Sequence, residues 1–410
     1  MKRIAIVVDS DVFHDARVLK IMRSLSKKYD VVVIGFSDVR FFNKNNIILA
    51  SSLVYRLSQI FINIFVGTSK ETFNINFINF YKKNISYLKI KRLLLDIFRH
   101  FRLKIKISAI RKVLSKIKAD IYYANDLPVL GICMTEAIRN NARLIYDSHE
   151  LYLEQGFFET RFLHEKYFYQ EKEGIKKADA VITVNEFIAK ELSKRYNYDF
   201  NKIQVIYNYP EGHRQERFCQ AECYSTNRKE VRLLYQGRFA PGRGLKELVL
   251  AMERVPDHYK LYMRGIGSYG KYLKECAKEK GLLNNRVFFL EPVGFNKLLS
   301  EASFADVGVL FYEPYCLNNY FASPNKLFDY INIPLAILCN GLPFLKKIID
   351  TYKVGICIDQ IDPNEIAKAI TQFTPENVFR YKLASFEASK ILNWKTEEEK
   401  LYKIIENLLK

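Results

Sequence analysis

The residues with the clearest potential for chemistry form a glycine- and arginine-rich segment in the second half of the chain. Gly237-Arg-Phe-Ala-Pro-Gly-Arg-Gly244 follows an apolar run typical of a buried strand and precedes a helical pattern. Glycines let the backbone approach a ligand closely, and a helix N-terminus favours an anion. Arg238 and Arg243 add guanidinium groups that can fork onto phosphate oxygens. Although a surface turn with solvated arginines is the alternative, we interpret the segment as a phosphate site.

A second group of polar residues lies in Ser323-Pro-Asn-Lys-Leu-Phe-Asp-Tyr330. Pro324 stands where a helix would begin, and Lys326 and Asp329 are three residues apart, so they share one helix face. A cation for phosphate beside a carboxylate for ribose hydroxyls is what a nucleoside diphosphate requires. An ordinary capped helix with one ion pair is the alternative. The remaining candidates for the same site are Ser323, Asn325, Gly265 and Gly267.

Three polar residues follow predicted strands in the first half of the chain. Asp126 comes after the strand Asp120–Ala124, and His149 and Glu150 come after the strand Arg143–Asp147. In doubly wound folds, ligands bind at the carboxyl ends of the strands. We therefore expect Asp126 to act as a base or as a charge stabiliser, with His149 and Glu150 as further catalytic candidates. A structural histidine is the alternative for His149.

Apolar runs alternate with helical patterns in both halves, which predicts an α/β protein with two doubly wound, Rossmann-like domains and a cleft between them. We expect a domain at 1–207, a linker at 208–230, a second domain at 231–390 and a C-terminal helix at 391–410. Residues 36–118 show less regular patterns. The predicted strands are Ile4–Val8, Val31–Gly35, Asp120–Ala124, Arg143–Asp147, Ala178–Val184, Val205–Tyr207, Arg232–Tyr235, Tyr259–Met263, Val287–Leu290, Val307–Leu310 and Leu335–Leu338.

The composition indicates a folded protein with an anionic partner. The chain has 410 residues and a formal net charge of +19, which suits nucleic acid, an acidic membrane surface or phosphorylated ligands. No nucleic-acid-binding motif occurs. Its seven cysteines are scattered at unrepeated spacings, which favours reduced thiols in a cytoplasmic protein over a zinc site. The N-terminal apolar run is too short for a signal peptide.

Basic residues are concentrated at 82–118, where thirteen lysines and arginines accompany a single acid, Asp96. Leu, Ile and Phe are interleaved with them throughout. Such a pattern suits an anionic bilayer, although a plain solvated face is equally compatible. We therefore predict that this segment docks on an anionic membrane surface.

The motifs together resemble the retaining GT-B glycosyltransferases of family 4. In the second half the resemblance rests on the two groups above and on Ala305-Asp306. In the first half it rests on Asp15-Ala-Arg-Val18, Ala124-Asn-Asp126, Tyr146-Asp-Ser-His-Glu150 and Ala178–Val184. It ends with Trp394 in the C-terminal helix, where these enzymes cross back to the first domain, so the resemblance implies that 391–410 returns to that domain. Each motif is loose, but their order and spacing are specific and cover nearly the whole chain.

The resemblance implies a metal-independent, retaining transfer from a UDP- or GDP-sugar bound to the second domain, with the acceptor bound to the first. Arg238 and Arg243 would hold the diphosphate and Asp329 the ribose. The sequence departs from the family at two places. Arginine stands at 243 in place of the usual lysine, and the family's paired glutamates would fall on Phe321 and Asp329. The donor sugar would then contact Asn319, Ser323 or the backbone amides of 321–324.

Asp9-Ser-Asp11 resembles the metal-binding Asp-x-Asp of the other large glycosyltransferase fold. It follows the first strand with no nucleotide-binding half before it, so we interpret it as a loop with helix-capping acids. We expect no metal ion and no other cofactor.

The sequence thus predicts a glycosyltransferase of cell-surface polysaccharide synthesis, such as lipopolysaccharide or capsule. We expect a saccharide or polyprenyl-linked acceptor, UDP rather than GDP in the donor, no nucleic acid, and a cytoplasmic location at the inner face of the plasma membrane. The alternatives are a GT-B nucleotide-sugar epimerase and a non-catalytic basic protein that binds membranes or nucleic acid.

Overall fold

Each half of the chain is organised around a parallel sheet of apolar strands, which fits the burial of such strands on both faces. The computed structural model describes residues 1–36, 47–49, 85–155, 161–211, 230–294 and 297–410. They divide into two units: Met1–Ile206 with Lys400–Lys410, and Tyr207–Glu399. The predicted pair of doubly wound α/β domains is therefore confirmed.

The first unit contains seven parallel strands in the order β3-β2-β1-β4-β5-β6-β7. In chain order they are β1 (Arg3–Asp11), β2 (Asp30–Phe36), β3 (Ile47–Leu49), β4 (Ile121–Asn125), β5 (Arg143–Ser148), β6 (Ala180–Thr183) and β7 (Ile203–Val205). Their helices are α1 (Ala16–Leu25), α4 (Ile85–Leu114), α5 (Leu127–Arg139), α6 (Arg161–Lys177) and α7 (Glu186–Tyr196). The strand order reverses between β1 and β4, which is where such folds bind ligands.

The second unit contains six parallel strands in the order β10-β9-β8-β11-β12-β13. They are β8 (Val231–Gln236), β9 (Tyr259–Arg264), β10 (Val287–Leu290), β11 (Val307–Leu310), β12 (Ala336–Asn340) and β13 (Gly355–Ile358). The helices are α9 (Leu245–Ala251), α10 (Tyr269–Glu279), α11 (Leu317–Tyr320), α12 (Asn325–Asn332), α13 (Pro343–Tyr352), α14 (Pro363–Thr371), α15 (Pro375–Ser389) and α16 (Trp394–Leu409). Here the order reverses between β8 and β11.

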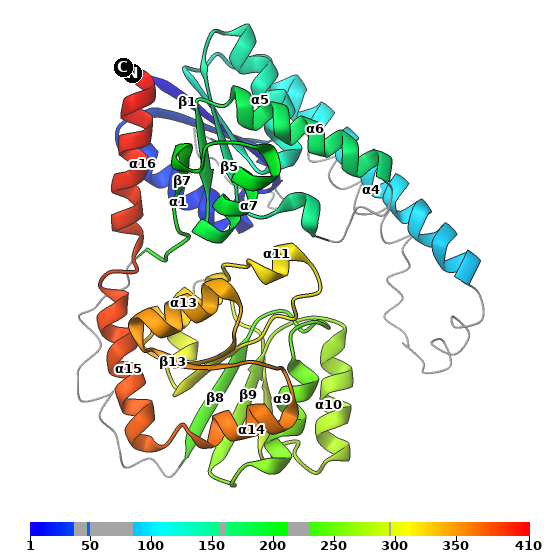
Figure 1. Ribbon diagram of the computed structural model, residues 1–410, viewed down its shortest axis with the longest axis vertical. Helices are drawn as coiled ribbons and strands as arrows, with labels where there is room; N and C mark the ends of the chain where they lie inside the picture. The colour runs from blue at the N-terminus through cyan, green and yellow to red at the C-terminus, as the bar shows by residue number, and fades with distance from the viewer. Residues whose placement is uncertain (37–46, 50–84, 156–160, 212–229, 295–296) are drawn as a thin grey trace. The chain divides into compact units, whose positions relative to one another are not determined.

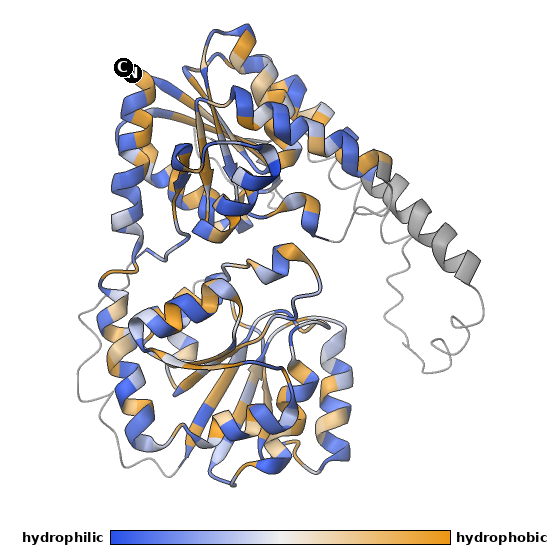
Figure 2. Cartoon of the chain, viewed as in Figure 1, coloured by the Kyte–Doolittle hydropathy of each residue, from blue (hydrophilic) through white to orange (hydrophobic). Residues whose placement is uncertain are grey.

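Helices cover both faces of each sheet (Figure 1). In the first unit α5 contacts both α4 and α6, and in the second unit α9 contacts both α10 and α14. Figure 2 shows mostly hydrophobic strands and helices that mix hydrophobic with hydrophilic residues. Among the described residues, no helix is both long and apolar enough to cross a membrane.

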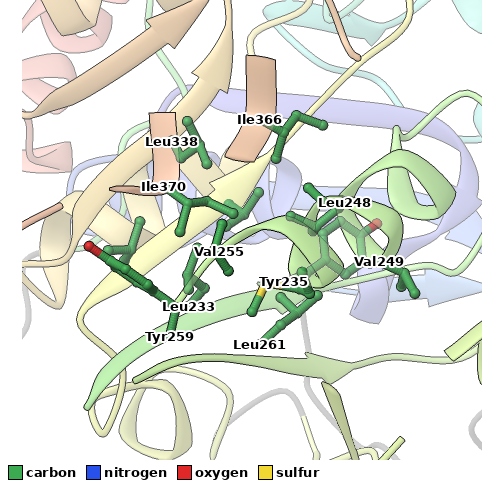
Figure 3. Close-up of a cluster of buried hydrophobic side chains, with 14 of the residues drawn as sticks. Leu233, Tyr235, Leu248, Val249, Val255, Tyr259, Leu261, Leu338, Ile366 and Ile370 are labelled. Atoms are coloured by element: carbon green, nitrogen blue, oxygen red, sulfur yellow. The ribbon is translucent and has the colours of Figure 1, made fainter. Parts of the chain in front are cut away.

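The core of the second unit supports the strands that lead into the candidate phosphate site. Leu233 and Tyr235 of β8 are buried with Leu248 of α9 and with Ile366 and Ile370 of α14 (Figure 3). Because β8 is buried in the middle of this sheet, it fixes the position of the glycine-rich segment that begins directly after it, at Gly237.

The predicted boundaries need several corrections, and one is that the last strand of the first unit lies at Ile203–Val205 and not at Val205–Tyr207. Asp9–Asp11 is not a loop but the end of β1, reached after a register irregularity beyond Val7. Residues 36–118 are not irregular throughout, because α4 spans thirty of them. The helical pattern after Gly244 gives only the short helix α9, which ends at Ala251 and continues as a 3₁₀ turn. The strand β13 has no counterpart in the prediction.

The unit boundaries also differ in detail from the predicted domains. Tyr207 to Glu211 belongs to the second unit, where Tyr209 packs edge-on against Phe328. The rest of the predicted linker, 212–229, lies outside the described residues. Lys400 to Lys410 belongs to the first unit although α16 begins in the second.

Candidate functional site

The glycine-rich segment leaves β8 beside the end of β11, at the point where the strand order of the second unit reverses. Gly237 has a φ of +151° and donates its N–H to the Arg264 carbonyl at 2.8 Å. A Cβ on Gly265 would lie 1.8 Å from the Gly237 carbonyl oxygen, and one on Gly267 would lie 2.2 Å from that of Phe239. Three of the predicted glycines thus let two loops pack backbone against backbone.

Two of the predicted cations lie against aromatic rings in this region. Lys326 of α12 places its Nζ 4.1 Å from the centroid of Tyr235, under the backbone of Gly237. The Arg243 guanidinium lies 3.9 Å from the centroid of Tyr312. The Nη1 of Arg243 is buried, and no hydrogen-bond partner for it is found among the described residues. A buried donor of this kind suits an anionic ligand.

The electrostatics of Lys326 link it to its neighbours. Burial and the positive charge of Arg243 lower the pKa of Lys326 to about 7, against the opposing effect of Asp329. The positive charges of Arg243 and Lys326 therefore repel each other in the free protein, and an anion between them would relieve this repulsion. Lys326 is therefore largely neutral at pH 8 and gains a proton most readily when a negative group arrives.

The other donor-site candidates, Arg238, Asn325 and Ser323, form no side-chain hydrogen bond or ion pair with Arg243 or Lys326 among the interactions of the described residues. Arg238 has an exposed side chain, and its carbonyl accepts the Tyr235 hydroxyl at 2.8 Å. Asn325 accepts a hydrogen bond from Asn208 at 2.8 Å. The Ser323 hydroxyl is buried, and no partner for it is found in the described part of the chain.

We do not assign the N-terminus of α9 a role in anion binding, although the sequence predicted one. Gly244 is the N-cap of α9, with a φ of +58°, but α9 has only seven residues. So short a helix adds little dipole, and we assign the anion site to Arg243 and Lys326.

In the first unit, Asp126 follows the end of β4 and His149 follows the end of β5, and both belong to an ionic cluster with Asp147 of β5 and Arg17 of α1. The His149 Nδ1 lies 3.4 Å from Asp126 Oδ2, and its Nε2 lies 3.5 Å from Asp147 Oδ2. Asp126 also accepts the His149 backbone N–H at 2.8 Å. Arg17 of α1 binds Asp147 through two hydrogen bonds of 3.0 and 2.9 Å.

The charges within this cluster shift the pKa values of His149, Asp126 and Asp147 in different directions. Burial opposes the charge of His149, but Asp126 and Asp147 outweigh it and raise the His149 pKa to about 9. Burial raises the pKa of Asp126 to about 7, although the His149 charge lowers it. For Asp147 burial is outweighed by Arg17 and His149, which hold its pKa well below the usual value. At neutral pH His149 is thus a cation, and Asp126 is the group poised to accept a proton.

The comparison with known proteins identifies the class of enzyme. Residues 73–209, a third of the chain, match the model of Glycosyltransferase Family 4. The chain is a GT-B glycosyltransferase. No curated protein matches it at a significant level.

The fold of the glycosyltransferase is shared by solved structures with low sequence identity. Sucrose-phosphate synthase from Thermosynechococcus elongatus has 16% identity and a TM-score of 0.68, over 100% of this chain and 99% of that one. HepE from Anabaena, solved with UDP and glucose, has 13% identity and a TM-score of 0.65, over 99% and 100%. A glycosyltransferase from Rickettsia africae has 13% identity and a TM-score of 0.64, over 100% and 99%.

Two residues of the glycosyltransferase that matter for the ionic cluster were not predicted as site residues. Asp147 and Arg17 stood inside motifs quoted for the family resemblance, but no role was assigned to them. The signal for Asp147 was an acid at the end of an apolar strand, where only a paired carboxylate is stable. The partner, Arg17, is distant in sequence and could not be deduced from spacing.

Glu150 is the predicted catalytic residue least integrated in the cluster. Its side chain is exposed and accepts the amide of Gln155 at 2.5 Å. Its negative charge still contributes to the raised pKa of Asp126. The assignments of Asp126, His149 and Glu150 to catalysis stay predictions.

Proposed function

We propose that this glycosyltransferase moves a sugar from a UDP-sugar, with retention of configuration and without a metal ion. The observation that carries the proposal is the buried Arg243 Nη1, for which the described residues supply no hydrogen-bond partner, together with the charge of Lys326 in the same unit. UDP is preferred over GDP because HepE from Anabaena, of the same fold, was solved with UDP. Retention rests on the family resemblance.

In this proposal the cations stabilise the leaving group. As the bond between sugar and phosphate breaks, negative charge grows on the diphosphate, and Arg243, Lys326 and the exposed Arg238 oppose it. Asp329, on the same helix as Lys326, binds the ribose hydroxyls. In the first unit, Asp126 accepts the proton of the acceptor hydroxyl, and the protonated His149 holds Asp126 in place.

We further propose a saccharide or polyprenyl-linked acceptor in the synthesis of a surface polysaccharide, with the enzyme at the inner face of the plasma membrane. The support comes from α4. Its described side chains expose Phe101 and Ile105 together with Lys104, Arg111 and Lys112. Mixed basic and apolar residues on one helix suit an anionic lipid surface. Residues 82–84 of the basic run lie outside the described residues.

The donor site is tested by titrating UDP and GDP into the protein by calorimetry. We expect UDP to bind, and Arg243→Ala to weaken binding by about tenfold to a hundredfold, because hydrogen bonds to charged groups contribute about 1.5–3 kcal/mol. The matched control is Arg380→Ala, an exposed arginine of the same unit over the ring of Tyr381, which should leave affinity unchanged.

Two results would contradict the proposal. If neither nucleotide binds, or if both arginine variants behave alike, the donor site is misplaced. If the protein converts a UDP-sugar into its epimer when no acceptor is present, it is an epimerase and not a transferase.

A further inference from the structure

The ring of Tyr312 lies against the guanidinium of Arg243, and neighbouring residues fix the position of Tyr312. It follows β11 by two residues, next to the end of β8. The guanidinium of Arg243 lies 3.9 Å from the ring centroid. A planar, weakly hydrated guanidinium can stack on such a ring, whereas the compact ammonium of a lysine gains less from it.

The backbone of Tyr312 is clamped by Asn340, the last residue of β12. The Tyr312 N–H donates to Asn340 Oδ1 at 3.0 Å, and Asn340 Nδ2 donates to the Tyr312 carbonyl at 2.9 Å. Strands β11 and β12 pair up to Leu310 and Cys339. The Asn340 side chain therefore links the segments that follow β11 and β12 beyond the last backbone pair of the two strands. Asn340 is buried, with 5% of its surface exposed, so this amide pair is shielded from competing water.

The same segment also fixes the residue before Arg243. The Glu313 N–H donates to the Gly242 carbonyl at 3.0 Å. The ring of Tyr315 lies close to Gly242, since a Cβ there would be 3.1 Å from a ring carbon. The carbonyl of Gly242, directly before Arg243, is thus held by Glu313, and the Arg243 guanidinium lies over the ring of Tyr312.

We propose that Tyr312 is a positioning residue that holds Arg243 ready for the diphosphate, with Asn340 fixing Tyr312. The inference rests on the proposed donor site. An arginine loses much rotamer freedom when it binds a ligand, and a ring that already restricts it reduces this cost. The arrangement also gives a physical reason for arginine at position 243, where the resemblance leads one to expect lysine.

A double-mutant cycle on UDP affinity tests the proposal by calorimetry. Tyr312→Leu should raise the dissociation constant by about tenfold, within the range of partly desolvated cation–π contacts. Tyr312→Phe keeps the ring and should stay within about twofold of the wild type. In an Arg243→Ala background, Tyr312→Leu should have no further effect, because the residue acts through Arg243.

Three outcomes separate the possibilities. If Tyr312→Leu leaves affinity unchanged while Arg243→Ala weakens it, the positioning role is wrong and the donor site stands. If Tyr312→Leu costs the same in both backgrounds, Tyr312 acts on the ligand or on the fold, and the inference also fails. If UDP does not bind the wild type, the proposed function itself fails. Circular dichroism of each variant shows whether it is folded, and the Tyr312→Phe protein supplies the test should the leucine variant unfold.

Discussion

Lys326 shows how a single buried residue can link ligand binding to pH. Its Nζ lies 4.1 Å from the centroid of Tyr235, and burial and the charge of Arg243 lower its pKa to about 7. The free protein therefore holds Lys326 mostly neutral above that pH, whereas a bound diphosphate favours the charged form and raises the pKa again. Binding above pH 7 must then be accompanied by proton uptake.

We predict that UDP binding at pH 8 takes up close to one proton and that affinity falls by up to about tenfold per pH unit above pH 7. Below pH 7 Lys326 is already charged, so its contribution is constant there. Calorimetry in buffers of different ionisation enthalpy measures the proton count. Lys326→Arg is the control, because arginine keeps the charge and does not titrate. Equal proton uptake by the wild type and this variant would show that Lys326 is not the group responsible.

Individual residues also show which contacts can be predicted from sequence spacing and which cannot. Lys326 and Asp329 could be placed on one helix face from sequence, because residues three apart on a helix share a face. The ring under Arg243 could not be predicted, because Tyr312 is distant in sequence and contacts it only once β8 and β11 are neighbours. Asp147 was likewise visible as an acid in a motif, but its partner Arg17 comes from another element.

At the scale of elements, the strands were the most predictable part of the molecule. The predicted Val287–Leu290 and Val307–Leu310 coincide with β10 and β11. A buried parallel strand is a continuous apolar run, and Asn185 caps α7 by accepting two backbone N–H groups. Asp11 likewise accepts the Phe13 N–H at the start of a 3₁₀ turn, as expected of a helix-capping acid.

Helix α4 was missed because its charges and apolar residues are spread around the helix without one clear stripe. The structure explains part of this distribution. Lys106 is largely buried, and its Nζ lies 2.5 Å from the Asp9 carbonyl oxygen and 5.3 Å from the Phe36 centroid. Lys104 and Lys112, in contrast, are exposed. From residue 100 onwards, where side chains are described, the basic run is therefore divided between the protein interior and the solvent, and of these residues only the exposed ones are available to a membrane.

We predict that α4 binds vesicles containing anionic lipid. Replacing Lys104, Arg111 and Lys112 with Glu should weaken this binding by about a hundredfold, because each cation near such a surface contributes about 1 kcal/mol. Flotation with phosphatidylglycerol vesicles, and with phosphatidylcholine vesicles for comparison, measures the effect.

The matched control for α4 is a triple variant on α10, where Lys271, Lys274 and Lys278 are exposed. It changes the net charge by the same amount. Equal losses for both variants would show that net charge alone drives association, and α4 would then have no special role.

At the scale of the whole molecule, the chain order of the two units was predictable, because each repeats the pattern of a doubly wound sheet. The family match covers 73–209, and the fold extends over both units. The predicted cleft between the domains stays a prediction. The return of the C-terminus to the first unit was expected from the resemblance, but its contacts require the structure: Tyr402 donates to the Ser24 carbonyl at 2.7 Å, and Lys28 pairs with Glu406 at 3.1 Å.

The buried residues of this C-terminal segment lead to a prediction about how the stability of the first unit can change without affecting the second. Leu401 and Ile405 are fully buried in the first unit. Ile405→Ala should therefore lower the free energy of unfolding of that unit by about 2–5 kcal/mol. Ile391→Ala is the control, because Ile391 is 58% exposed and its loss should cost little. Because two units need not unfold in one step, calorimetric unfolding with and without UDP is the measurement.

UDP should stabilise the transition of the second unit, which holds Arg243 and Lys326, and Ile405→Ala should shift the other transition while leaving UDP affinity unchanged. That pattern follows if the donor site is built entirely from Tyr207–Glu399. A loss of UDP affinity in the folded Ile405→Ala protein would mean that the first unit contributes to nucleotide binding. A single transition that responds to both changes would mean that the units unfold together, so that mutations in α16 act on the donor site through the stability of the whole chain.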